Sequence, residues 1–109
     1  MRLSQKIAMF FALGAIPTFS LMAADAAAGQ KVYTAKCRTC HGPAGQGNPA
    51  MAKVLKAEIR DLGSVEVQHK SDDELKKESR DGTGRMKPTA GLTGADLENV
   101  IAYIRTLKK

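Results

Sequence analysis

The chain has 109 residues, enough for one small domain, and its 43% hydrophobic and 26% charged residues exclude wholesale disorder. Aromatic residues make up only 5% and tryptophan is absent, so we expect a group other than the polypeptide to fill part of the core. The formal net charge of +6 favours an anionic partner surface, but basic and acidic residues are interleaved, which argues against nucleic acid as the partner.

The first two dozen residues have the pattern of a secretory signal peptide. Arg2 and Lys6 give a short positive segment, and an uncharged, mostly apolar run follows over residues 7–22. Small residues come next, at Ala23 and Ala24. This order of charge, apolar run and small residues is typical of a segment that directs export and is then removed. We therefore expect the mature protein to be periplasmic.

An uncleaved membrane anchor is the alternative interpretation of this segment. The apolar run is shorter than the ~20 residues that a spanning helix needs, and Pro17 interrupts it. We expect cleavage at one of the two alanines, with Ala26 as a weaker choice, and no stable membrane insertion afterwards. The chain then divides into a signal peptide, residues 1–23, and one domain, residues 24–109. Without residues 1–23, the chain has 15 basic and 11 acidic residues and therefore a net charge of +4.

The first element of the mature domain is predicted to be a helix. Asp25 can cap its N-terminus, and the helix is expected over residues 26–33. Gly29, Val32 and Tyr33 then fall on one side, at spacings of three and four residues. This helix leads directly into the two cysteines of the chain.

The middle of the domain is predicted to hold short helices between loops. Glycine and proline indicate a loop over residues 42–49, and residues 50–57 can form a short helix. Residues 65–70 are ambiguous. The run Ser-Asp-Asp-Glu at residues 71–74 is a capping-box pattern, and the polar helix that it opens should end near Gly82.

A second loop is predicted over residues 81–88. The C-terminal segment that follows has the clearest helical pattern of the chain. Thr93 and Asp96 give another capping-box candidate at its start, and its last turn is basic, which suits the helix dipole. Its apolar stripe consists of Leu97, Val100, Ile101, Ile104 and Leu107. The predicted fold class is all-α, with long loops around the middle.

Residues 37–41 read Cys-Arg-Thr-Cys-His, the attachment signature of c-type haem. Two cysteines three positions apart in a helical turn lie on one face, where each thiol can form a thioether with one haem vinyl group. His41 follows at once and projects its imidazole toward the iron from the same side. Attachment takes place outside the cytoplasm, in agreement with the predicted signal peptide. We predict Cys37 and Cys40 as covalent haem-binding residues and His41 as an iron ligand.

Three other interpretations of the cysteines fit less well. A thioredoxin-like pair needs a strand–turn–helix context, whereas here a helix precedes the motif and a glycine-rich loop follows it. A zinc site needs about four ligands, so the distant His69 would have to join the motif, and the adjacent Cys40 and His41 fit a tetrahedron poorly. A disulfide across two residues would close a tiny loop and stabilise the fold little.

The second axial ligand must come from another part of the chain, and the candidates are Met86, Met51, His69 and a lysine. We favour Met86, because it lies in a loop between two capped helices, where a thioether can point inward without belonging to a helix face. Met51 follows His41 by only ten residues, and His69 lies in a polar run typical of a solvated surface histidine. Filling a gap in an apolar core is the alternative role for any methionine.

The chain resembles the class I c-type cytochromes over essentially all of residues 25–109. Gly29 and Tyr33 stand eight and four positions before Cys37, as the small residue and the aromatic of the family's first helix do. Residues 100–104, Val-Ile-Ala-Tyr-Ile, match the terminal helix of the family, whose aromatic packs across that small residue. The resemblance implies a small cytochrome c fold, in which the N- and C-terminal helices cross and short middle helices and loops surround one haem.

The resemblance also implies roles for two loop residues. Pro49 corresponds to the family's proline whose backbone carbonyl accepts the ring N–H of the haem histidine, here His41, and such a bond would fix its tautomer. Met86 occupies the position of the distal methionine. In the family this methionine often directly precedes proline, whereas here Lys87 stands between Met86 and Pro88.

The expected function is that of a periplasmic single-electron carrier with one covalent haem c per chain. Ligation by His41 and Met86 would leave no open site for a substrate, so we expect an electron-transfer protein and not an enzyme, a monomer that shuttles between respiratory redox proteins. A catalytic or ligand-sensing haem protein and a thiol–disulfide enzyme are the alternatives. Cations expected to steer an acidic partner surface are Arg38, Lys53, Lys56, Arg85 and Lys87, with an ordinary solvated surface as the alternative.

Overall fold

The computed structural model describes Gly14 and residues 24–109, so the predicted signal peptide lies outside the described residues except at Gly14. The described part of the chain is helical and contains no strand, only one isolated bridge, which confirms the predicted all-α class. The helices are α1 (Ala26–Lys36), α2 (Arg38–His41), α3 (Pro49–Leu55), α4 (Val65–Gln68), α5 (Asp72–Asp81) and α6 (Gly94–Thr106). Within these residues, no helix is long and apolar enough to cross a membrane.

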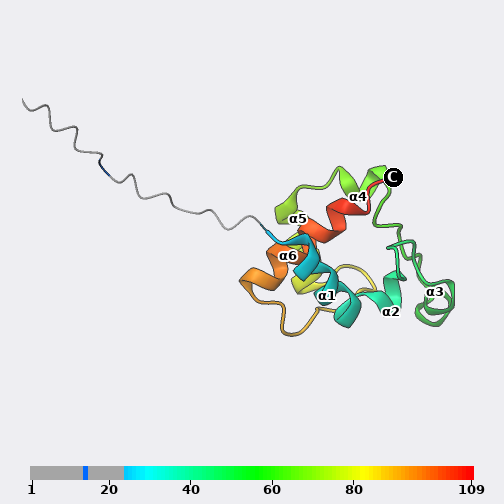
Figure 1. Ribbon diagram of the computed structural model, residues 1–109. Helices are drawn as coiled ribbons and strands as arrows, with labels where there is room; N and C mark the ends of the chain where they lie inside the picture. The colour runs from blue at the N-terminus through cyan, green and yellow to red at the C-terminus, as the bar shows by residue number, and fades with distance from the viewer. Residues whose placement is uncertain (1–13, 15–23) are drawn as a thin grey trace, which may run out of the picture.

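The first and last helices, α1 and α6, form the principal helix pair, as Figure 1 shows. Their backbones meet at Gly29, where an added Cβ atom would lie 1.8 Å from the carbonyl oxygen of Asn99. Just before α1 begins, the backbone N–H of Asp25 donates to the side chain of Asn99 at 2.8 Å. The predicted crossing of the terminal helices is therefore confirmed, and glycine is the residue that allows it.

The aromatic residue of α6 packs against α1 near this contact. The atoms nearest to an added Cβ at Gly29 belong to the backbone of Asn99 and Val100. Tyr103, one turn after Asn99, packs against Tyr33, one turn after Gly29, with ring centroids 5.1 Å apart in a tilted arrangement.

The core is aliphatic and centres on the predicted stripe of α6. Tyr33 is its one aromatic member among the described residues and is 1% exposed. The other buried side chains are Val67, Leu75, Leu92, Leu97, Val100, Ile101 and Ile104. Leu107, predicted as the end of the stripe, caps α6 and is only half-buried.

Local capping explains where two of the longer helices begin. The carboxylate of Asp25 accepts hydrogen bonds from two N–H groups of the first turn of α1, and the Ser71 hydroxyl accepts one from Glu74 at the start of α5. The capping box predicted at Thr93 is wrong in one respect, because its side chain makes no capping hydrogen bond. Helix α6 is held by the burial of its apolar face, which outweighs a single cap.

One arginine joins α6 to the segment between α4 and α5, which the sequence left ambiguous. The Arg105 guanidinium donates to the carbonyl oxygens of Gln68 and Lys70, at 2.8 and 2.6 Å, and to the carboxylate of Asp72 at 2.8 Å. The Gln68 side chain returns a hydrogen bond to the carbonyl oxygen of Ile104 at 3.0 Å. This segment therefore bends around the end of α6.

Candidate functional site

The two cysteines and the adjacent histidine lie in a single helical turn at the end of α1. The N–H of His41 donates to the carbonyl oxygen of Cys37 at 3.0 Å, and the N–H of Gly42 donates to that of Arg38 at 2.8 Å. Such i to i+4 bonds put residues 37, 40 and 41 on one side of the turn. Both cysteines are free thiols and half-buried. The structure thus brings Cys37, Cys40 and His41 together, as the sequence predicts.

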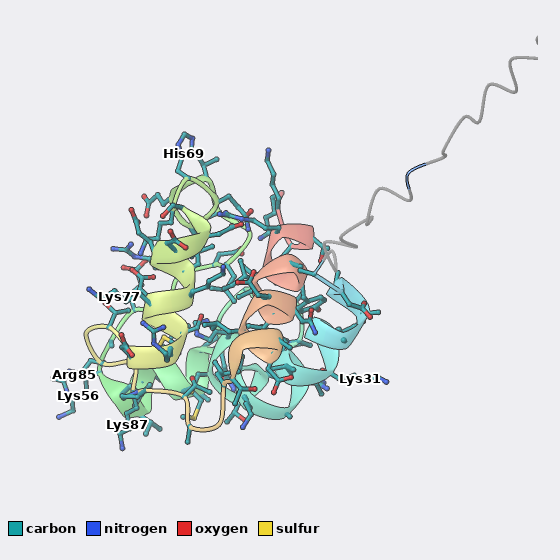
Figure 2. All side chains as sticks on the ribbon, turned by 90° about the vertical axis from the view of Figure 1, so that its left-hand side faces the viewer. Lys31, Lys56, His69, Lys77, Arg85 and Lys87 are labelled. Atoms are coloured by element: carbon teal, nitrogen blue, oxygen red, sulfur yellow. The ribbon has the colours of Figure 1, made fainter. Side chains whose placement is uncertain are left out.

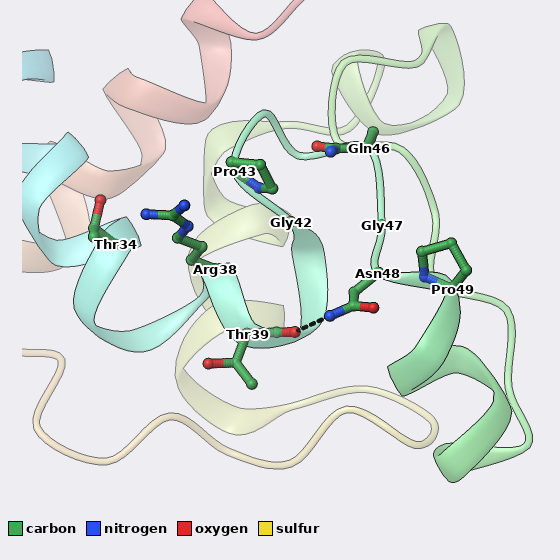
Figure 3. A pocket seen from close by; sticks show the side chains of 9 residues that line it. All are labelled: Thr34, Arg38, Thr39, Gly42, Pro43, Gln46, Gly47, Asn48 and Pro49. Atoms are coloured by element: carbon green, nitrogen blue, oxygen red, sulfur yellow. Dashed lines mark hydrogen bonds between the residues drawn. The ribbon is translucent and has the colours of Figure 1, made fainter.

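The loop after this turn folds back and fixes its backbone. The N–H groups of Gly47 and Asn48 donate to the carbonyl oxygens of His41 and Cys40 at 2.7 and 2.9 Å. The Asn48 side chain also donates to the Thr39 carbonyl oxygen at 3.1 Å, the bond drawn as a dashed line in Figure 3. The carbonyl groups that a helix end leaves free are therefore satisfied, and the turn is rigid.

A tyrosine from α1 supports the same loop. The Tyr33 hydroxyl donates to the carbonyl oxygen of Gly42 at 2.5 Å. Burial raises the pKa of Tyr33 to about 12, so the hydroxyl stays protonated and keeps its donor at neutral pH. The sequence indicated Tyr33 as a packing residue but gave no signal for this hydrogen bond, nor for the one from Asn48.

A separate cavity of about 450 Å³ lies between the turn and the loop (Figure 3). Its lining includes Thr34, Arg38 and Thr39, together with Asn48 and Pro49. Neither cysteine lines it, and neither does the histidine of the motif. The two middle residues of the motif therefore face this cavity, whereas the candidate haem-binding side chains do not.

The imidazole of His41 is partly buried and suited to bind a metal. Burial lowers its pKa below the ordinary value, which favours the neutral ring with a free lone pair. Its Nδ1 atom is buried and has no hydrogen-bond partner, so the predicted hydrogen bond from the ring N–H to the Pro49 carbonyl oxygen is not formed in this structure. Pro49 is the first residue of α3, where the carbonyl group points along the helix axis toward the N–H four residues on.

The Cys37 thiol does not resemble the attacking thiol of a thiol–disulfide enzyme. Burial raises the pKa of Cys37 to about 11, whereas the attacking cysteine of such an enzyme needs a lowered pKa. The zinc set considered from the sequence is not assembled either, because no three His, Cys, Asp or Glu side chains of the described residues are grouped to hold a metal ion.

Met86 lies in a tight turn after α5. Thr83 and Met86 pair through two backbone hydrogen bonds of 3.1 and 2.9 Å. The turn starts at Gly82, whose φ of +80° suits glycine and where a Cβ atom would lie 2.4 Å from the Met86 carbonyl oxygen. The side chain of Met86 is half-buried. The loop that follows Met86 is held to α1 by Lys36, whose side chain donates to the Ala90 carbonyl oxygen at 2.9 Å.

The two other ligand candidates lie in different surroundings. Met51 is in the middle of α3 and is half-buried. His69 caps α4 and is exposed, and Figure 2 shows it projecting from the molecule at the far end from Arg85 and Lys87, the two neighbours of Met86. An exposed histidine at that end is a solvated surface residue, as the sequence suggested.

Comparisons with known proteins agree with this site. The family model for cytochrome c matches residues 26–108. The chain is 41% identical to cytochrome c-554(547) of Halothiobacillus neapolitanus over 91 residues, which cover 79% of this chain and 100% of that protein. It is 38% identical to a cytochrome c6 of a Picosynechococcus species, with 90% and 83% covered. The solved structure of the KustC0563 c-type cytochrome superposes with a TM-score of 0.63 at 30% identity, covering 74% of this chain and 98% of that one.

The chain therefore belongs to the cytochrome c family, and the resemblance seen in the sequence is confirmed. It is an electron-transfer protein that carries covalently bound haem c.

The residues present fit this group. The two thiols and the imidazole share one side of a turn without converging on a common point, and partial burial favours the neutral form of the imidazole. A porphyrin requires this separation, because thioethers form at its edge and an axial ligand binds at its centre.

Proposed function

We propose that Cys37 and Cys40 hold the haem through thioether bonds and that His41 is one axial ligand of its iron. The observation that carries this proposal is the single hydrogen-bonded turn that presents the two free thiols and the neutral imidazole from one side. The loop of residues 42–48 keeps that turn rigid, so the three side chains are oriented before the haem arrives. The unpartnered Nδ1 of His41 needs an acceptor, and the Pro49 carbonyl stays our prediction for that role in the haem-bound chain.

Met86 is proposed as the second axial ligand. Its half-buried side chain stands on a turn that is closed by the Thr83 hydrogen bonds and permitted by Gly82. A thioether held on such a turn can meet the iron without distorting a helix. Met51 sits within a helix, and His69 is exposed at the end of α4, so both are weaker candidates.

With both axial positions filled, the function is to carry single electrons between redox proteins. Haem iron supplies a one-electron couple, and a sulfur ligand raises its reduction potential. His41 and Met86 stay in place during the change of charge, so little reorganisation accompanies each transfer. The aliphatic core around Tyr33 and Val100 keeps water from this side of the chain. We propose respiratory proteins with acidic docking surfaces as partners, and a monomeric carrier.

We further propose that residues 1–23 are a cleaved signal peptide and that residues 24–109 are the mature periplasmic domain. The cytochrome c match begins only at residue 26, and 79% of this chain suffices to cover the whole of the Halothiobacillus relative. Residues 1–25 therefore lie outside the match to the family model, which supports a boundary near residue 24. Mass spectrometry of the exported protein identifies the mature N-terminus, and a product that keeps its leader would contradict this part of the proposal.

The axial ligation is tested by the near-infrared absorption of the oxidised protein. Sulfur ligation to ferric haem gives a weak band there, and we expect Met86→Ala to abolish it. Met51→Ala is the matched control, because it removes a methionine of similar burial, and it should leave the band intact. Loss of the band in the Met51 variant alone would reassign the ligand to α3, and absence of the band from the unaltered protein would refute sulfur ligation.

A further inference from the structure

A short series of backbone hydrogen bonds joins the turn of the Cys-x-x-Cys-His motif to the loop that follows it. The N–H of Gly47 donates to the carbonyl oxygen of His41 at 2.7 Å. The N–H of Asn48 then donates to the carbonyl oxygen of Cys40 at 2.9 Å. The next bond of this series would start from Pro49, which has no N–H to donate. The backbone series therefore stops just before α3 begins.

The side chain of Asn48 supplies the bond that Pro49 cannot make. Its amide nitrogen, Nδ2, donates at 3.1 Å to the carbonyl oxygen of Thr39, the acceptor next in order after that of Cys40. Figure 3 draws this bond, with Pro49 next to Asn48 at the start of α3. A side chain thus continues the hydrogen bonds between loop and turn at the point where the backbone cannot.

The oxygen of the same side chain determines where α3 begins. Oδ1 of Asn48 accepts hydrogen bonds from the N–H groups of Ala50 and Met51, at 3.0 and 3.5 Å. These are the first N–H groups that the helix offers, because Pro49 at its first position has none. The orientation of the amide is well defined, since its nitrogen faces a carbonyl oxygen and its oxygen faces N–H groups. Asn48 therefore ties the turn of the motif to the N-terminus of α3 through one short, half-buried side chain.

Helix capping alone does not require asparagine at this position. Aspartate and serine cap a helix about as well as asparagine does. An aspartate carboxylate, however, has no donor for the Thr39 carbonyl oxygen, and the shorter serine side chain has one hydroxyl in place of a separate donor and acceptor. Asparagine supplies both groups from one side chain. The bond to the turn, and not the cap, is therefore what distinguishes Asn48 from the other capping residues.

We propose that Asn48 is a positioning residue for His41 and acts through the carbonyl group of Pro49. The inference rests on the haem ligation proposed above and names the residue that orients it. Because Asn48 ties the turn of His41 to the first turn of α3, it holds the Pro49 carbonyl oxygen within reach of the imidazole in the haem-bound chain. The buried Nδ1 of His41 has no partner within the turn and needs that acceptor. An imidazole held in this way is better oriented and more basic as a ligand.

The test uses the haem-loaded protein in its ferrous form, isotopically labelled for NMR, and measures how fast the ring N–H of His41 exchanges with deuterium from the solvent. Asn48→Asp keeps the acceptor that caps α3 and removes the donor to Thr39. We expect this variant to exchange the ring N–H roughly 3- to 10-fold faster, because one hydrogen bond is weakened. The backbone N–H of Ala52 bonds to the carbonyl oxygen of residue 48 within α3, and it should exchange no faster than in the unaltered chain.

Two further variants separate the position of Asn48 from the charge that aspartate adds. Gln46→Glu is the matched control, because it adds the same charge to the same loop and keeps the oxygen that accepts from the N–H of Ala44. It should leave the exchange of the ring N–H unchanged. Asn48→Ser is neutral and also caps a helix, so it should speed the exchange of the ring N–H without added charge. It should also raise the reduction potential, since a less basic imidazole stabilises ferric iron less, and a lower or unchanged potential would contradict the proposal.

The other possible results each decide one claim. If Asn48→Asp and Gln46→Glu affect the ring N–H equally, or neither affects it, Asn48 is not a positioning residue. If the N–H of Ala52 accelerates together with the ring N–H in both Asn48 variants, Asn48 acts only as a helix cap, which also overturns the proposal. A ring N–H that exchanges at once in the unaltered haem-loaded protein has no acceptor, and this would refute the role of Pro49 as well. An unaltered chain that binds no haem contradicts the proposed function itself.

Discussion

The backbone of Gly29 in α1 lies against the carbonyl group of Asn99 in α6, so close that no side chain fits between them. This contact sets the crossing of the two terminal helices. Because the turn with the proposed haem-binding residues begins directly where α1 ends, the same contact fixes the position of Cys37 relative to the core.

Substitution of Gly29 by alanine should destabilise the protein strongly. The new Cβ atom would clash with backbone atoms, which cannot rotate away, so α1 and α6 must separate. We expect a loss of about 2–3 kcal/mol in the free energy of unfolding. Denaturant unfolding measures it, with Gly94→Ala as the control, because a Cβ at Gly94 meets nothing within 4 Å. Equal stabilities of the two variants would contradict this account of the helix pair.

Tyr33 should make the protein sensitive to strong alkali. Its pKa is raised to about 12 in the folded chain from an ordinary value of 10.0, chiefly by burial. A raised pKa means that the folded state favours the protonated phenol. The contribution to stability is therefore complete below pH 10 and is lost as the pH rises to about 12. The difference in unfolding free energy between the unaltered chain and Tyr33→Phe should fall over this interval, and a constant difference would refute a buried, protonated Tyr33.

Replacing Lys56 by glycine should stabilise the protein, because Lys56 ends α3 with a φ of +50°. Glycine adopts the left-handed conformation without strain, so we expect the free energy of unfolding to rise by roughly 0.5–1 kcal/mol. Thermal unfolding of the variant and of the unaltered chain measures this change. A variant that is no more stable than the unaltered chain would show that the left-handed conformation costs Lys56 nothing.

The stability of the fold should depend on the several N–H donors of the Arg105 guanidinium and not only on its positive charge. It donates to the carbonyl oxygens of Gln68 and Lys70 and to the Asp72 carboxylate at the same time. Lysine at this position keeps the charge but cannot reach all three acceptors, so Arg105→Lys should cost about 1–2 kcal/mol in unfolding free energy. Lys108→Arg serves as the control at an exposed position of the same segment. Full retention of stability in Arg105→Lys would show that the charge alone suffices.

Local signals allowed much of this protein to be predicted from its sequence. Asp25 and Ser71 specify helix starts through bonds to their own first turns, and the Cys-x-x-Cys-His motif is complete within one turn. Asn48 before Pro49 was a readable cap signal that the sequence analysis missed.

Features that depend on packing between distant segments could not be predicted in this way. The bonds from Tyr33 to Gly42 and from Arg105 to the α4–α5 segment join residues that the chain brings together only when it folds. The contact between the rings of Tyr33 and Tyr103 depends on how closely α1 and α6 approach and is of the same kind. The left-handed turn at Lys56 carries no sequence signal, because glycine would be expected there.

The central claim is that one haem is bound through both cysteines of the turn that ends in His41. Peptide mass spectrometry of the purified exported protein tests it most directly. The account predicts a fragment containing residues 37–41 whose mass includes one haem joined by two thioether bonds, and none with both thiols free. A colourless product in which Cys37 and Cys40 react fully with a thiol reagent would contradict it.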